Sequence, residues 1–201
     1  MRKAAAISAA ALKAGGEAIE PGITTAEIDK IIYDFIVRHG ARPNFLHLYG
    51  FPATACISVN DTVIHGIPSR DQKIRPGDIV SIDTGCKIDG FNGDNACTFA
   101  CGKLDLEAQR LLDVTKESLH LGIAAAQAGA RVGDIGHAVQ SYVEENGFSV
   151  VREYVGHGVG KELHEDPEFP IMHAGRGQRL MPGMCIAIEP MICQYKCAVR
   201  P

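Results

Sequence analysis

Apolar residues recur at intervals of three and four in several stretches of the chain, which is the pattern of a helix with one buried face. An alanine-rich first stretch predicts an amphipathic surface helix that ends at Gly15-Gly16, since alanine favours helices and glycine is typical of helix ends. Thr24 and Glu27 have the spacing of a capping box, so a second helix is expected to begin there and to end at Gly40. Two further helices are expected at 106–128 and at 134–146, the latter capped by Asp134.

Other apolar stretches, bounded by turn residues, predict strands. The Asp89-Gly90 dipeptide is a hairpin signal, so residues 91–99 are expected to fold back on a strand at 78–84. Helix followed by strands occurs in each half of the chain, which predicts an α+β fold with helices on one face of a mainly antiparallel sheet. No linker divides the chain, so residues 1–201 are expected to form a single domain. The remaining strands are expected at 54–59, 148–152 and 184–189.

Composition narrows the functional classes. The chain has 201 residues, is 46% hydrophobic and carries a net charge of -4, which argues against a nucleic-acid binder held by positive charge. Its seven cysteines lie at irregular spacings and predict reduced, buried thiols of an intracellular protein. The shared spacing of Cys97 with Cys101 and of Cys193 with Cys197 leaves a soft-metal site as the alternative. No apolar run is long enough to cross a membrane.

Two aspartates flank the predicted hairpin turn. Asp83 and Asp94 are 94 − 83 = 11 positions apart, an odd separation that directs both side chains to one face of the sheet if the turn has an even length. Two carboxylates on adjacent strands can share a pair of metal ions, as in two-metal hydrolases. The alternative is a pair of solvent-exposed turn carboxylates. Glu189 ends another apolar stretch. A carboxylate there either binds a partner such as a metal ion or is exposed to solvent at the edge of the sheet.

Three histidines lie in glycine- or proline-rich segments that predict loops, where functional residues concentrate. His157 is flanked by glycines in GHGVG, which suits a crowded ligand position. A phosphate-binding loop is the alternative, but it requires a helix directly afterwards, and LHEDP predicts a loop. His65 and His164 are the other two. Carboxylates mixed with imidazole suit hard or borderline divalent ions better than a structural zinc.

Four ordered segments together resemble the type I methionine aminopeptidases of the creatinase/aminopeptidase family. They are NFLHLYGFPATACISVNDTVIHGIP, the hairpin SIDTG…GFNGDNACTF, VGHGVGKELHEDPEFP and MPGMCIAIEPM, and the resemblance covers nearly the whole chain. It implies the pita-bread fold, a curved and mainly antiparallel sheet with helices on its outer face and two pseudo-symmetric halves.

The resemblance also implies a role for each matching residue. Asp83 and Asp94 look like ligands of one metal ion, with Asp94 bridging to a second ion held by His157 and Glu189. His65 and His164 look like the histidines that contact the substrate, and Glu189 and His164 like the residues that handle protons and the developing charge. Cobalt, manganese, iron and zinc all suit this ligand set. The pocket for the methionine side chain is expected at Phe45, Phe51, Cys56 and Leu163; Leu48 stands where many relatives carry an aromatic residue.

The implied reaction removes the initiator methionine from nascent chains whose second residue is small. The implied partners are nascent polypeptide N-termini near the ribosome, with no nucleic acid or membrane, and a cytoplasmic monomer is expected. The family carries one more bridging glutamate on a later strand, whereas the residues after Glu189 are PMICQYKCAVRP. We therefore expect a chain that lacks the final strands and starts inside the usual first helix. Such a chain is expected to hold at most one metal ion tightly. The alternatives are a non-catalytic relative that binds peptide tails and a proline-directed peptidase of the same fold.

Overall fold

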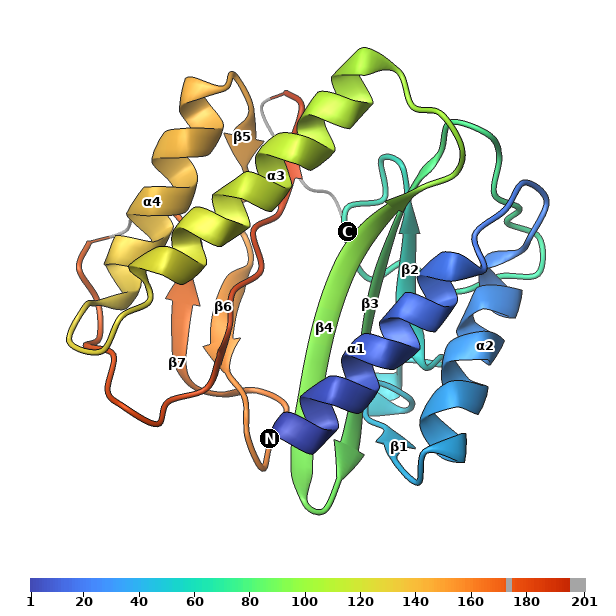
Figure 1. Ribbon diagram of the computed structural model, residues 1–201, viewed down its shortest axis with the longest axis horizontal. Helices are drawn as coiled ribbons and strands as arrows, with labels where there is room; N and C mark the ends of the chain where they lie inside the picture. The colour runs from blue at the N-terminus through green and yellow to red at the C-terminus, as the bar shows by residue number, and fades with distance from the viewer. Residues whose placement is uncertain (173–174, 196–201) are drawn as a thin grey trace. The chain divides into compact units, whose positions relative to one another are not determined.

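A computed structural model describes residues 1–172 and 175–195. The chain divides into two compact units (Figure 1). The first unit contains residues 1–105 together with residues 159–163, and the second contains the remainder. Each unit has its own hydrophobic core.

Two helices cover one side of the first unit. α1 (Arg2–Glu17) buries Ala4, Ser8 and Ala11 along one face, and these small side chains allow the helix to approach the sheet closely. α2 (Thr25–Arg38) begins with the predicted capping box, in which Glu27 N–H donates to Thr24 Oγ1 and Thr24 N–H donates to the Glu27 carboxylate.

The sheet of the first unit is built around its longest hairpin. β3 (Ile79–Ile88) pairs with β4 (Phe91–Ala100) along one edge and with β2 (Ala55–Val59) and the short β1 (Arg42–Pro43) along the other. All of these pairings are antiparallel, as predicted. A short 3-10 helix, η1 (Leu48–Gly50), lies between β1 and β2 in the sequence.

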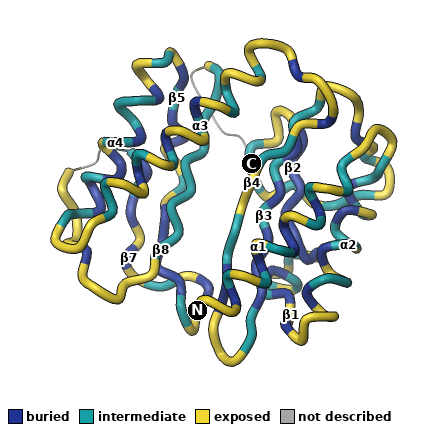
Figure 2. Tube along the Cα trace, viewed as in Figure 1, coloured by how far each residue is buried: buried dark blue, intermediate teal, exposed yellow. Residues whose placement is uncertain are grey.

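Alternation along β3 separates the two faces of this sheet. Val80, Ile82 and Cys86 are fully buried and belong to the same core as Ile28 and Ile32 of α2. The intervening residues therefore point to the opposite face. β2 is buried along its entire length, so both of its faces are covered (Figure 2).

The second unit contains the other two helices, α3 (Leu106–Ala125) and α4 (Val132–Glu145). Its strands are short: β6 (Val155–Gly158) pairs with β7 (Glu165–Pro170) and β8 (Ile186–Ala187), and β5 (Ser149–Val150) pairs with β9 (Ile192–Cys193). Fully buried residues of α4 pack with Phe169 and Ile171 to form the core.

Several boundaries differ from the expectations. The third helix ends at Ala125, and the fourth begins at Val132 with Asp134 in its first turn, where its carboxylate accepts the Arg131 N–H. Asp134 was predicted as the residue that precedes the helix, but Arg131 holds that place, so the prediction is wrong by three residues. The strand expected at 184–189 is confined to Ile186–Ala187, and the one expected at 148–152 to Ser149–Val150.

The cysteines follow the expectation only in part. Cys56, Cys86 and Cys101 are buried free thiols, and Cys97 and Cys185 are exposed free thiols. Cys193 takes part in a disulfide, so the expectation of reduced thiols is wrong there. Cys197 lies outside the described residues. None of the helices in the described ranges has both the length and the apolar character required to span a membrane.

Candidate active site

Asp83 and Asp94 share one face of the β3–β4 hairpin, as the parity of their separation predicts. Asp83 pairs with Ala96 and Asp94 pairs with Gly85, so the two carboxylates are diagonal neighbours on the face opposite α1 and α2. The two-residue turn that sets this register is Asp89-Gly90, and both of its residues have a positive φ, 52° and 82°. Both aspartates are partly buried, which makes them available to a ligand yet poorly hydrated.

A thiol faces this carboxylate pair from the neighbouring strand. Cys56 lies directly opposite Asp83 in the β2–β3 register. Burial raises the pKa of the Cys56 thiol to about 12, and the charges of Asp83 and Asp94 add to the effect. The thiol is therefore neutral at physiological pH, and its surroundings carry a negative potential that suits a cation.

His157 and Glu189 form the second predicted pair, within the second unit. His157 Nε2 lies 3.1 Å from Glu189 Oε1, and the histidine side chain is only 7% exposed. Its Nδ1 lies 2.8 Å from the carbonyl oxygen of Gly158, an atom that can only accept, so Nδ1 carries a proton. In the neutral ring Nε2 then presents a lone pair toward the carboxylate. Two electron-rich atoms facing one another suit a shared cation, so this pair fits a metal ion.

His164 lies beside His157. Their ring centroids are 4.5 Å apart in an edge-to-face arrangement. Burial is the main cause that lowers the pKa of His164, the neighbouring His157 lowers it further, and the carboxylates of Glu189 and Glu168 act in the opposite direction. A neutral ring at this position can donate or accept one hydrogen bond. Glu168 was not anticipated from the sequence, although it follows His164 by only four residues.

The surroundings of His157 correct one expectation, because this residue lies in strand β6 and not in a loop. A Cβ atom on Gly156 would lie 2.6 Å from Ala187 O, and one on Gly158 would lie 2.4 Å from Asp166 O. These glycines are therefore required by the close approach of the flanking strands. The segment after His164 is also a strand, β7, where a loop was expected.

The predicted side-chain pocket residues lie together in the first unit. Phe45, Cys56 and Leu163 form one buried apolar cluster, with Leu48 and Phe51 packed against it. Cys56 connects this cluster with the carboxylate face, since it lies opposite Asp83.

His65 occupies an exposed and conformationally constrained position in the first unit. Its φ is 57°, which is uncommon for a residue other than glycine. The next residue, Gly66, donates its N–H to Ser58 Oγ and accepts the Ile57 N–H at its carbonyl, which ties the His65 backbone to β2. Ser58 was missed in the sequence because nothing in its spacing distinguishes it from other strand residues.

The predicted metal ligands are thus present as a carboxylate pair in the first unit and a histidine–glutamate pair in the second. Within residues 1–172 and 175–195, no group of three or more His, Cys, Asp or Glu side chains is close enough to hold a metal ion. The oxygen donors of the first pair and the nitrogen and oxygen donors of the second nevertheless suit the same class of divalent ion.

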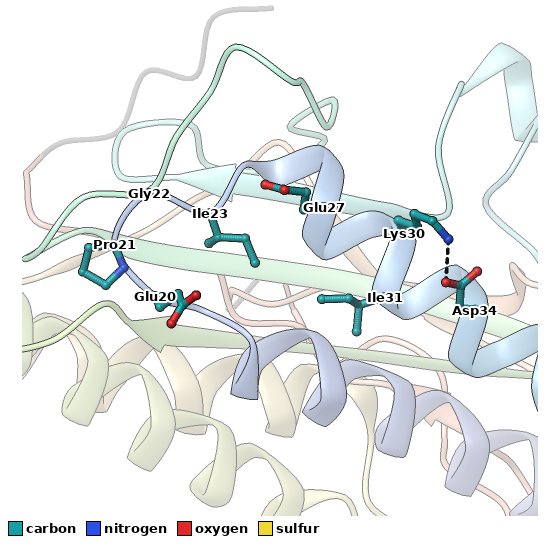
Figure 3. A pocket seen from close by; sticks show the side chains of 8 residues that line it. All are labelled: Glu20, Pro21, Gly22, Ile23, Glu27, Lys30, Ile31 and Asp34. Carbon is teal, nitrogen blue, oxygen red and sulfur yellow. Dashed lines mark hydrogen bonds and ion pairs between the residues drawn. The ribbon is translucent and has the colours of Figure 1, made fainter.

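A separate hollow lies on the outside of α2 and the turn that precedes it. It has a volume of about 660 Å³ and includes Glu20, Glu27 and Asp34 among its lining residues (Figure 3). Lys30 forms a 2.6 Å ion pair with Asp34 in its wall. None of the predicted metal or substrate residues lines this hollow.

Comparison with known proteins shows the family to which the chain belongs. Residues 1–200 match the family model described as "Metallopeptidase family M24". A methionine aminopeptidase of Clostridium perfringens is 51% identical over 193 residues, which cover 96% of this chain and 77% of the relative.

Solved structures show the same relationship. The methionine aminopeptidase of Thermotoga maritima superimposes with a TM-score of 0.95 at 39% identity, covering 97% of this chain and 79% of that one. The prolidase of Pyrococcus furiosus has a TM-score of 0.80 at 26% identity and is covered to only 53% of its length. The fold is thus the α+β pita-bread fold that the sequence motifs implied. The chain therefore belongs to metallopeptidase family M24, together with the bacterial methionine aminopeptidases.

Proposed function

We propose that this chain removes the N-terminal methionine from polypeptides whose second residue is small, and that it does so with two divalent metal ions, of which it holds at most one tightly. The observation that carries the proposal is the pair formed by the buried His157 and the partly buried Glu189, in which Nε2 and Oε1 lie 3.1 Å apart while His157 Nδ1 donates to Gly158 O. The identity with methionine aminopeptidases over 96% of the chain supports the same reaction class.

The proposed ligands are Asp83, Asp94, His157 and Glu189. When bound, the ions polarise the scissile carbonyl and lower the pKa of water enough for it to act as a nucleophile near neutral pH. Cobalt, manganese, iron and zinc are all compatible with these donors. We expect the free amino group of the substrate to be held at the same site, which explains the restriction to N-termini.

Two histidines are proposed to act on the substrate directly. His164, neutral at pH 7 because burial lowers its pKa, donates a hydrogen bond to the carbonyl oxygen as negative charge develops there. Glu189 accepts the proton released by the attacking water and passes it to the leaving amine. His65, fixed beside β2 by the Gly66 contacts, is proposed to bind the peptide backbone.

The apolar cluster of Phe45, Cys56 and Leu163, with Phe51 and Leu48 beside it, is proposed to receive the methionine side chain. An apolar lining with one polarisable sulfur suits a flexible thioether. The neutral state of Cys56 is favourable here, since an apolar side chain packed against a thiolate would remove the water that solvates its charge.

The proposed substrate source is the nascent chain near the ribosome in the cytoplasm, and the proposed state is a monomer. The negative net charge of -4 supports contact with polypeptide rather than direct contact with RNA.

The test is hydrolysis of a Met-Ala-Ser peptide by the purified chain, with manganese or cobalt added and with a chelator added. We expect methionine release with the metal and none with the chelator. Asp94→Asn should reduce kcat/KM by at least about 100-fold, whereas Asp89→Asn in the exposed turn of the same hairpin should leave it unchanged.

Other outcomes separate the alternatives. Peptide binding without methionine release at any metal concentration would replace the proposal with a non-catalytic peptide-binding protein. Hydrolysis of X-Pro peptides in preference to Met-Ala peptides would indicate a proline-directed peptidase instead.

A further inference from the structure

One carboxamide connects the segment 159–163 to the sheet of the first unit. Asn92, in β4 and only 2% exposed, donates both hydrogens of its Nδ2, to Gly160 O at 3.1 Å and to Lys161 O at 2.9 Å. Its backbone N–H also donates to Gly160 O, at 2.8 Å. Lys87 Nζ donates to Lys161 O at 2.6 Å. Two consecutive carbonyl oxygens of this segment, those of Gly160 and Lys161, thus each accept two hydrogen bonds.

A second carboxamide extends the connection to the other edge of the sheet. Asn44 Nδ2 donates to Asn92 Oδ1 at 3.3 Å, and the Asn44 backbone N–H donates to Gly85 O at 3.2 Å. The Asn44 carboxamide lies over Gly85, because a Cβ atom there would be 2.4 Å from Asn44 Oδ1. The absence of a side chain at Gly85 therefore creates the space that the two carboxamides need to meet.

These two asparagines hold the chain segments that supply the walls of the apolar cluster. Asn44 immediately precedes Phe45, and Lys161 precedes Leu163 by two residues. Phe45 and Leu163 are two of the three buried residues of that cluster. The third, Cys56, is held independently by its place in β2. A shift of the Asn44–Asn92 pair therefore changes the separation of Phe45 and Leu163 without moving Cys56.

We propose that Asn92, together with Asn44, is a positioning residue that fixes the distance between Phe45 and Leu163 and thereby sets the selectivity for the side chain of the first substrate residue. This inference rests on the proposed function, since it concerns the same pocket. It depends on asparagine specifically: an aspartate has the same size but no donors, and it would place a charge against two carbonyl oxygens.

The position of the segment can be tested without any measurement of activity. Trypsin cleaves after Lys161, and cleavage requires that the segment leave its hydrogen bonds. In Asn92→Asp the rate of this cleavage should rise about fivefold or more, the factor that one net hydrogen bond represents. Cleavage after Lys116, on the exposed side of α3, serves as the internal reference for global unfolding.

Two further variants keep the test decisive. Asn92→Ala removes the donors without introducing a charge, so it replaces the aspartate variant if that one does not fold. Lys87→Met removes only one of the two contacts to Lys161 O and should have a smaller effect. Equal rates after Lys161 in the wild-type and Asn92→Ala chains would overturn the proposal.

The consequence for selectivity is measured as the ratio of kcat/KM for Met-Ala-Ser to kcat/KM for Leu-Ala-Ser. This ratio does not depend on the fraction of folded enzyme, so a purely structural role would not change it. We expect it to fall about fivefold or more in Asn92→Ala and Asn44→Ala. An unchanged ratio with both rates lowered equally would overturn the selectivity role.

A wild-type chain that hydrolyses neither peptide would instead contradict the proposed function. The positioning role would then be decided by the trypsin comparison alone.

Discussion

The reactivity of the Cys56 thiol is determined by the residues that lie next to it on the sheet. It shares a sheet face with Asp83 and Asp94, and both charges oppose its ionisation in addition to burial. Cysteine reactivity follows the thiolate fraction, so a buried thiol beside two carboxylates is unreactive. The thiols of Cys97 and Cys185 are exposed, unlike that of Cys56.

Alkylation should therefore distinguish these cysteines. With iodoacetamide at about pH 8, we expect Cys97 and Cys185 to react on the order of 10³ times faster than Cys56, because the pKa of Cys56 lies near 12. Peptide mass spectrometry after timed quenching measures the rates. Asp83→Asn should accelerate labelling of Cys56. Equal labelling rates of Cys56 and Cys97 in the folded wild-type chain would contradict the prediction that the Cys56 thiol is unreactive.

Gly66 determines how His65 is presented. A Cβ atom on Gly66 would lie 2.2 Å from Ile57 O, a backbone atom that cannot move without disturbing β2. Gly66→Ala should therefore lower the free energy of unfolding by roughly 1–3 kcal/mol.

Urea denaturation measures this loss, and Ile67→Ala is the matched control. Ile67 is adjacent but 58% exposed, so its substitution should change stability by less than about 0.5 kcal/mol. Equal stabilities of the two variants would show that the strand backbone adapts to the added methyl group.

At the scale of single residues, the placement of the carboxylates was predicted from the sequence more accurately than the surroundings of the histidines. The same-face placement of Asp83 and Asp94 follows from parity and a two-residue turn, both of which are local. The environment of His157 depends on strands that contribute Ala187 and Asp166, about 10 to 30 residues further along the chain, and glycine alone does not reveal such contacts.

At the scale of elements, α2 is joined to the beginning of β2 by one carboxylate. Asp29 Oδ1 accepts the N–H groups of Thr54 and Ala55 at 2.9 and 2.8 Å. Burial nevertheless raises the pKa of Asp29, and these two hydrogen bonds only partly offset the effect.

The sign of the resulting pH dependence follows directly. A carboxyl group whose pKa is raised on folding binds protons more readily in the folded state, so its contribution to stability declines as pH rises from its ordinary pKa of 3.8 through the folded pKa. Asp29→Asn keeps a carbonyl acceptor but cannot ionise. Its stability relative to the wild type should therefore be more favourable at about pH 7 than at about pH 3.5.

Urea unfolding of both chains at the two pH values measures this difference. Asp34→Asn, at a side chain in the same helix that is 45% exposed, is the control for the substitution itself. A relative stability of Asp29→Asn that falls with rising pH would refute the argument.

Helices were predicted more accurately than strands because their signals are local. The Thr24–Glu27 capping box and the helix period locate α2 closely. The strands of the second unit are only two to six residues long and depend on partners remote in sequence, so their extents could not be obtained from alternation.

At the scale of the whole molecule, the two cores share none of the residues that the structure describes. Ile82 belongs to the core of the first unit and Ile135 to the core of the second, and both are fully buried. Removal of buried methylene groups costs both transfer free energy and the cavity that remains.

We therefore expect Ile82→Ala and Ile135→Ala to lower the free energy of unfolding by about 2–5 kcal/mol each. Since the two side chains have no common partner in their clusters, the double variant should show the sum within about 0.5 kcal/mol. A double-mutant cycle by chemical denaturation tests this, and a coupling above about 1 kcal/mol would mean that the cores respond to each other.

The segment 159–163 has a consequence for the order of folding. It belongs to the first unit, yet the second unit provides the residues on both sides of it in the sequence. Its anchor on Asn92 spans a separation of 69 residues, a contact that carries a large loop-closure cost. During synthesis the β3–β4 hairpin emerges well before Leu163, so the apolar cluster stays open on that side until the ribosome has added most of the second unit. Completion of the apolar cluster is therefore a late event, timed by translation and not by the folding of the sheet beneath it.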